Sequence, residues 1–147
     1  MVVLSMVSLQ IASIEAQEPL QLQVKVDKEV YDSDEVIKIS GIVSLSDGTA
    51  VANALVSIQV VGPDDAIYHI ALVYSNDTGG FLDEYRTPEG APNGLYIAYI
   101  KASKVGFKDA QSQVEYSVIP ELSSPFLAML PVLLVTILAI YVIRKRG

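Results

Sequence analysis

The feature that most constrains the fold is an alternation of apolar and polar residues with a period of two. In the segment LQLQVKV, the apolar residues Leu20, Leu22, Val24 and Val26 would share one face of a strand, because successive side chains point to opposite faces. Further strand-like runs occupy residues 36–45, 54–61, 81–86, 95–103 and 110–118, and a more uniformly apolar run occupies 67–74. The alternation predicts seven strands, and no stretch before residue 125 predicts a long helix.

Residues that favour tight turns separate these runs. They are Asp47-Gly48, Gly62-Pro63-Asp64, Thr78-Gly79-Gly80, Pro92-Asn93-Gly94 and Gly106. Seven short strands at this spacing are typical of an antiparallel sandwich. The sequence therefore predicts an all-β chain with one immunoglobulin-like sandwich domain over residues 17–119.

The C-terminal part has a different pattern. Residues 126–143 carry no charge, and a basic cluster at 144–147 follows them. A helix over this apolar run would be about 27 Å long, close to the hydrocarbon core of about 30 Å, and basic residues favour the cytoplasmic side. The pattern predicts a short linker at 120–125, a transmembrane helix at 126–143 and a basic cytoplasmic tail at 144–147. The predicted location is the plasma membrane, single-pass, with the N-terminal domain extracellular and membrane lipid as partner of residues 126–143.

The N-terminal residues 1–16 contain an apolar stretch too short to span a bilayer, and Ala16 suits a cleavage point. They predict a secretory signal peptide, although no Lys or Arg precedes the apolar run. An uncleaved N-terminal helix is the alternative.

The charge balance limits the partners. Lys and Arg number 10 against 17 Asp and Glu, and every acidic residue precedes the apolar run. Nucleic acids and anionic headgroups bind basic patches, so no nucleic acid is expected as a partner. The chain has no cysteine, so the predicted exported domain must be stable without a disulfide.

The stretch YDSDEVIKISGIVSLSDGTAVANALVSIQV resembles macroglobulin-like and bacterial-type immunoglobulin-like domains. Their pattern is Tyr-x-Pro-Gly-Asp-x-Val-x-Ile-x-Gly, which Tyr31, Ile37, Ile39 and Gly41 match, while residues 33–35 depart from its turn. Two later stretches, NDTGGFLDEY and NGLYIAYIKAS, resemble a turn and a Gly-x-Tyr strand of the same families. The resemblance implies a fold rather than an activity, and such domains serve as spacers, adhesive modules or binding platforms.

The tail beginning at Pro120-Glu121 resembles the C-terminal tails of archaeal surface proteins. Those tails carry Pro-Glu-Phe-Pro or a close variant before a hydrophobic segment and a basic end, and a sorting enzyme processes some of them. This chain has Leu122 in place of the Phe. The resemblance implies an archaeal cell-surface protein.

Catalytic residue types are scarce. With no cysteine and a single histidine, His69, the chain offers no thiol nucleophile, no serine-triad motif and no zinc or copper ligand set. Asp83 and Glu84 are adjacent on a predicted strand and so point to opposite faces. We expect no enzyme and no organic cofactor.

Calcium is the one cation the sequence suggests. Five acidic residues fall within nine positions, around the turn after the first strand: Asp27, Glu29, Asp32, Asp34 and Glu35. Calcium takes six to eight oxygen ligands, and such a loop can provide several. Solvated acidic turns are the alternative interpretation.

Asn76-Asp77-Thr78 is an Asn-x-Thr sequon, which predicts glycosylation of Asn76 at a turn. Together these features favour a membrane-anchored extracellular immunoglobulin-like module, non-catalytic, that serves adhesion, envelope contact or the binding of a ligand or protein. The alternative is an accessory single-span subunit of a larger membrane complex. Other surface or membrane proteins are the expected partners in either case.

Overall fold

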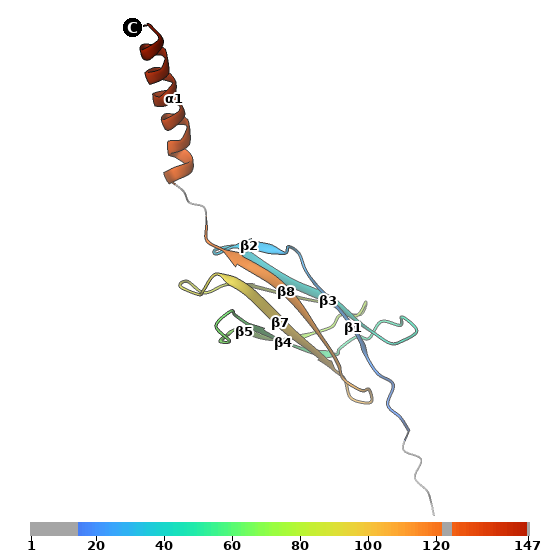
Figure 1. Cartoon of the computed structure of the whole chain (residues 1–147). Coiled ribbons are helices and arrows are strands. Elements are labelled where there is room, and N and C mark those ends of the chain that lie inside the picture. The colour runs from blue at the N-terminus through green and yellow to red at the C-terminus, as the bar shows by residue number, and fades with distance from the viewer. Residues whose placement is uncertain (1–14, 122–124, 147) are drawn as a thin grey trace, which may run out of the picture.

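The computed structural model describes residues 15–121 and 125–146, with side chains described for 15–121 and 131–145. It shows a β-sandwich followed by one helix (Figure 1). The strands are β1 (Gln21–Val26), β2 (Val30–Asp32), β3 (Val36–Ser44), β4 (Leu55–Val61), β5 (Ile67–Tyr74), β6 (Gly80–Arg86), β7 (Gly94–Ser103) and β8 (Ala110–Ile119). The predicted signal peptide at 1–16 lies almost entirely outside the described residues.

The strands form two sheets. One has the order β1-β3-β6 and the other the order β2-β8-β7-β4-β5. All neighbours are antiparallel except β2 and β8, which pair in parallel. In immunoglobulin letters the sheets read A-B-E and A′-G-F-C-C′, which matches the arrangement of that fold.

Tyr96, near the start of β7, supports the same assignment. Its side chain is fully buried, and its hydroxyl donates a hydrogen bond of 2.6 Å to the backbone carbonyl of Pro92. A tyrosine at this corner, bonded to the backbone a few residues upstream, is a hallmark of immunoglobulin sandwiches. The chain therefore has this fold without the disulfide that often accompanies it.

The core lies between the two sheets, where the alternation predicted it. Ile37, Ile39 and Val43 of β3 are fully buried, and they face the other sheet, where the buried residues of β4 are Val56, Ile58 and Val60. Alternate positions of β4 are more exposed, so each strand buries one face only.

Three tyrosines of the five-stranded sheet pack together at one end of this core. Tyr31 meets Tyr116 edge to face with 5.4 Å between ring centroids, and Tyr96 stacks on Tyr116 at 5.7 Å. Aromatic pairs in these geometries add to the stability that burial provides. Their hydroxyls also find partners: Tyr31 donates to Asp27 at 2.6 Å, and Tyr116 meets the hydroxyl of Tyr85.

The prediction of seven antiparallel strands was wrong in two respects. The described residues contain eight strands, and the additional one, β2, pairs in parallel with β8. β2 has only three residues, so it is too short to show a periodic pattern. It forms because Tyr31 is completely buried against the core, which brings its backbone beside β8.

The helix α1 (Pro125–Arg146) follows the sandwich and extends away from it (Figure 1). Over the residues that the structure describes, no helix combines the length and apolar character needed to cross a bilayer. This finding contradicts the predicted transmembrane helix at 126–143 and the single-pass plasma-membrane location.

Candidate functional site

The acidic residues predicted to bind calcium are only partly brought together. Asp27, Asp32, Asp34 and Glu35 line one surface cavity, of which Glu29 is not part. Within the described residues no group of three or more acidic or histidine side chains is arranged to hold a metal ion. Calcium binding by these residues stays a prediction.

Basic side chains share that cavity and bind its carboxylates. Lys28 forms an ion pair with Glu35, and Arg86 lies 3.5 Å from the Asp34 carboxylate. A calcium ion would have to displace these cations, and both pairs are accessible to water, which weakens them.

Asp27 has a structural role in the same place. Its carboxylate accepts hydrogen bonds from the Tyr31 hydroxyl at 2.6 Å and from the backbone nitrogen of Lys38 at 3.1 Å. The bond from Tyr31 is the main reason that the pKa of Asp27 lies below its usual value. In return, burial together with the bond to Asp27 raises the pKa of Tyr31 to about 12. The Asp27 carboxylate thus binds a core tyrosine and is not open to a calcium ion.

His69 and Asp83 join the edges of the two sheets. His69 Nε2 lies 2.7 Å from Asp83 Oδ2, and the imidazole stacks on Tyr85 with 4.1 Å between ring centroids. Glu84 points to the opposite face, where it forms an ion pair with Lys38 at 3.0 Å. The expected separation of Asp83 and Glu84 is therefore what the structure shows.

Asn76, the predicted glycosylation site, is exposed at the turn between β5 and β6. Its side-chain oxygen accepts hydrogen bonds from the backbone nitrogens of Thr78 and Gly80, at 3.0 and 2.9 Å. An asparagine that bonds to the backbone two residues on is a common way to stabilise a turn. The turn geometry accounts for this residue, and glycosylation stays a prediction.

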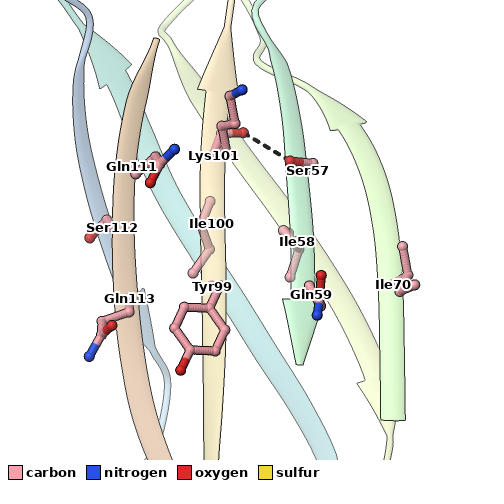
Figure 2. A pocket seen from close by; sticks show the side chains of 10 residues that line it. All are labelled: Ser57, Ile58, Gln59, Ile70, Tyr99, Ile100, Lys101, Gln111, Ser112 and Gln113. Atoms are coloured by element: carbon pink, nitrogen blue, oxygen red, sulfur yellow. Dashed lines mark hydrogen bonds between the residues drawn. The ribbon is translucent and has the colours of Figure 1, made fainter. Parts of the chain in front are cut away.

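A groove of about 580 Å³ crosses the outer face of the five-stranded sheet. Figure 2 shows its lining, which comes from β4, β5, β7 and β8. The outward side chains that line it are Ser57, Gln59, Ile70, Tyr99, Lys101, Gln111 and Gln113.

The register of the strands decides which of these side chains are neighbours. Gln59 is opposite both Ile70 on β5 and Tyr99 on β7, and Tyr99 is opposite Gln113 on β8. A row across the sheet therefore reads Ile70, Gln59, Tyr99, Gln113. The Tyr99 ring, 45 % exposed, lies between two glutamine amides.

The groove is close to neutral although the chain is acidic. No carboxylate lines it, and its single charged residue, Lys101, forms an ion pair of 2.8 Å with Asp109 outside the lining. Glutamine amides each offer donors and an acceptor, and the Ser57 hydroxyl, which donates to the Lys101 carbonyl at 3.5 Å, offers an acceptor. Such a surface suits an uncharged ligand that both donates and accepts hydrogen bonds.

Sequence reasoning missed this groove. The alternation does place Gln59, Tyr99 and Gln113 on outward faces of their strands, and this was the available signal. Their proximity depends on the order β8-β7-β4-β5, which brings together residues that are far apart along the chain.

No family model matches the sequence, and no curated protein sequence matches it. Among solved structures, the sporulation control protein of Bacillus subtilis matches with a TM-score of 0.51 and 15 % identity, over 68 % of this chain and 49 % of that one. This chain thus spans about half the length of that protein, and the likeness shows a common fold.

Two weaker structural likenesses are to a bacterial immunoglobulin-like domain of the M. primoryensis ice-binding adhesin and to the soluble domain of PmoD from Methylocystis. The first has a TM-score of 0.45 and 12 % identity over 71 % of this chain and 100 % of that one. The second has a TM-score of 0.43 and 11 % identity over 69 % of this chain and 92 % of that one. Neither likeness supports an inference about activity.

Proposed function

We propose that this chain is a non-catalytic binding module, and that the groove on its five-stranded sheet binds an uncharged, hydroxyl-rich chain such as an oligosaccharide. The observation that carries the proposal is the position of Tyr99, half exposed on a sheet face and flanked by Gln59 and Gln113.

The chemistry of this row fits a sugar ring. The apolar face of a sugar can pack on the ring of Tyr99, while its hydroxyls exchange hydrogen bonds with the amides at either side. The neutral lining offers no ion pair to an acidic or basic ligand, since Lys101 already has Asp109 as a partner. A groove on an open sheet face also leaves room for a ligand longer than one ring.

The position of the single histidine supports a binding role over a catalytic one. His69 lies between the sheet edges in contact with Asp83 and Tyr85, and it does not line the groove. The groove therefore holds no histidine and no carboxylate to act as a general acid or base.

Binding of neutral oligosaccharides to the full chain, screened on an array and measured by calorimetry, tests the proposal. Replacing Tyr99 with alanine should weaken the binding of any oligosaccharide found by at least about tenfold, because it removes the stacking surface. Leu95→Ala is the control, since Leu95 is an exposed apolar residue on the same strand as Tyr99 and lies outside the groove lining.

Equal affinity of the Tyr99→Ala variant and the unchanged chain would refute the assignment of the site. Binding only to acidic polysaccharides, and only at low salt, would refute the assignment of a neutral ligand. An array without any binding sugar would also count against it.

A further inference from the structure

The edge strands of the two sheets differ in how well they are protected against pairing with a further strand. The edges over the described residues are β1 and β6 in one sheet and β2 and β5 in the other. Natural proteins place charges on exposed edges, or keep the edge strand short, because unpaired backbone groups recruit other strands. Lys25 lies on β1, three charged residues lie on β6, and β2 has only three residues including Asp32.

Strand β5 is the exception. Its sequence, IYHIALVY, contains no Asp, Glu, Lys, Arg or Pro, and it forms a ladder with β4 only. Its one histidine, His69, is bonded to Asp83. The ladder with β4 has one register shift, at the start of β5 opposite Val60 and Val61, and from Ile70 to Tyr74 the edge carries none of the usual features that prevent strand addition.

The outward side chains of β5 form an apolar row. Ile70, Leu72 and Tyr74 are 66 %, 65 % and 67 % exposed, and they are neighbours because alternate residues share a face. The residues between them, Ala71 and Val73, pack against the core. A continuous apolar row of this kind on a free edge is typical of a surface that another strand covers.

We propose that β5 pairs antiparallel with β5 of a second copy of this chain, so that the two five-stranded sheets become one continuous sheet. A two-fold axis through the pair would place the apolar row of one copy beside the same row of the other, which makes the contact self-complementary. The chain carries a net charge of −7, so two copies repel except where both surfaces are uncharged. Within the described part of the chain, β5 is the edge that meets this condition.

The edge row and the ligand groove share one residue, Ile70, and otherwise use different groups. Edge pairing uses backbone groups of β5 together with Leu72 and Tyr74, which do not line the groove, whereas the groove is centred on Tyr99. The dimer would carry two grooves on one sheet face. Ligand binding can be measured in a variant that no longer dimerises, and dimerisation can be measured in a variant that no longer binds the ligand.

Spin labels on β4 of the full chain test the pairing without changing β5. Because the chain has no cysteine, Leu55→Cys, Ser57→Cys and Gln59→Cys each provide a single labelling site opposite Tyr74, Leu72 and Ile70. In an antiparallel pair, a move of two residues along the strand changes the separation of the two labels in the strand direction by about 14 Å, at about 3.4 Å per residue. With the two-fold axis at Leu72, pulsed dipolar spectroscopy should therefore give the shortest distance for Ser57→Cys and longer, similar distances for Leu55→Cys and Gln59→Cys.

The variant Leu72→Lys is the matched disruption, because it places a charge at the centre of the row on each copy. It should remove the dipolar distances and convert the dimer seen by sedimentation velocity to monomer, with an unchanged circular dichroism spectrum. Tyr99→Ala should leave the dimer intact.

Three results would overturn the proposal. They are a monomer in the unchanged chain at every concentration, equal label distances at the three β4 positions, and distances that persist in Leu72→Lys. The last two would mean that copies associate through a different surface.

Discussion

Replacing Gly41 with alanine should destabilise the sandwich by separating strands of the three-stranded sheet. Gly41 lies in β3, opposite Val24 of β1 and Phe81 of β6. A Cβ atom at this position would lie 2.2 Å from the backbone oxygen of Gln23 and 2.6 Å from Cζ of Phe81. The backbone oxygen cannot rotate away as a side chain can, so β1 has to move by about 1 Å to reach ordinary contact distance.

The expected loss follows from two opposing effects. Overpacking of a tight site costs about 1–3 kcal/mol, and the shift of a backbone places Gly41→Ala in the upper part of that range. Loss of glycine freedom in the unfolded chain returns about 0.4–1 kcal/mol. The net destabilisation of about 2 kcal/mol corresponds to a decrease in Tm of about 8–16 °C for a domain of this size.

Thermal unfolding of the full chain, followed by circular dichroism, measures this change. Gly48→Ala is the control: Gly48 has φ +87° and no atom within 4 Å of an added Cβ. It should lose only the strain of a left-handed conformation, about 1 kcal/mol. A decrease in Tm for Gly41→Ala no larger than for Gly48→Ala would refute the reasoning from the close approach of β1 and Phe81.

Two further predictions concern hydrogen bonds of buried groups. The buried hydroxyl of Ser75 donates a hydrogen bond to Val51 O at 2.6 Å and accepts one from Ala54 N at 2.9 Å. Ser75→Ala removes both bonds, so urea unfolding should show a decrease of about 1–3 kcal/mol in the free energy of unfolding. An unchanged midpoint of urea unfolding would contradict this. Burial, and to a lesser degree the bond to Asp27, raises the pKa of Tyr31 to about 12. The folded state therefore keeps a proton that the unfolded chain loses near pH 10. The free energy of unfolding should fall as the pH rises from about 10 to about 12. Absorbance at 295 nm should show the same number of ionised tyrosines at pH 11 in Tyr31→Phe and in the unchanged chain, and one fewer in the variant above about pH 12. A number already one lower in the variant at pH 11 would contradict the prediction.

Much of the fold was predictable because the signals are local. The alternation that placed Val56, Ile58 and Val60 on one face of β4 is a property of consecutive residues, and burial follows it. The same reasoning could not find β2, since three residues show no period and its pairing with β8 joins residues 30–32 to 117–119. The apolar run at 126–143 predicted a helix, and α1 confirms that a helix forms there, but the described residues do not support a span.

The candidate calcium site likewise combines features that are local in the sequence with features that arise only on folding. The acidic residues near β2 are close in sequence, which suggested a shared ion. Groups from other strands bind two of their carboxylates instead: the Arg86 side chain of β6 lies by Asp34, and the backbone nitrogen of Lys38 in β3 donates to Asp27. Such partners are invisible in a local reading because they arrive by folding.

The sequence by itself determined the strand segments, the inward faces of the strands and the immunoglobulin-like class, because each depends on spacing along the chain. Only the tertiary structure decided that Gln59, Tyr99 and Gln113 form one row and that β5 is a free, uncharged edge. Those features depend on which strands become neighbours, and that choice is made by the packing of both sheets around the buried tyrosines and aliphatic side chains of the core.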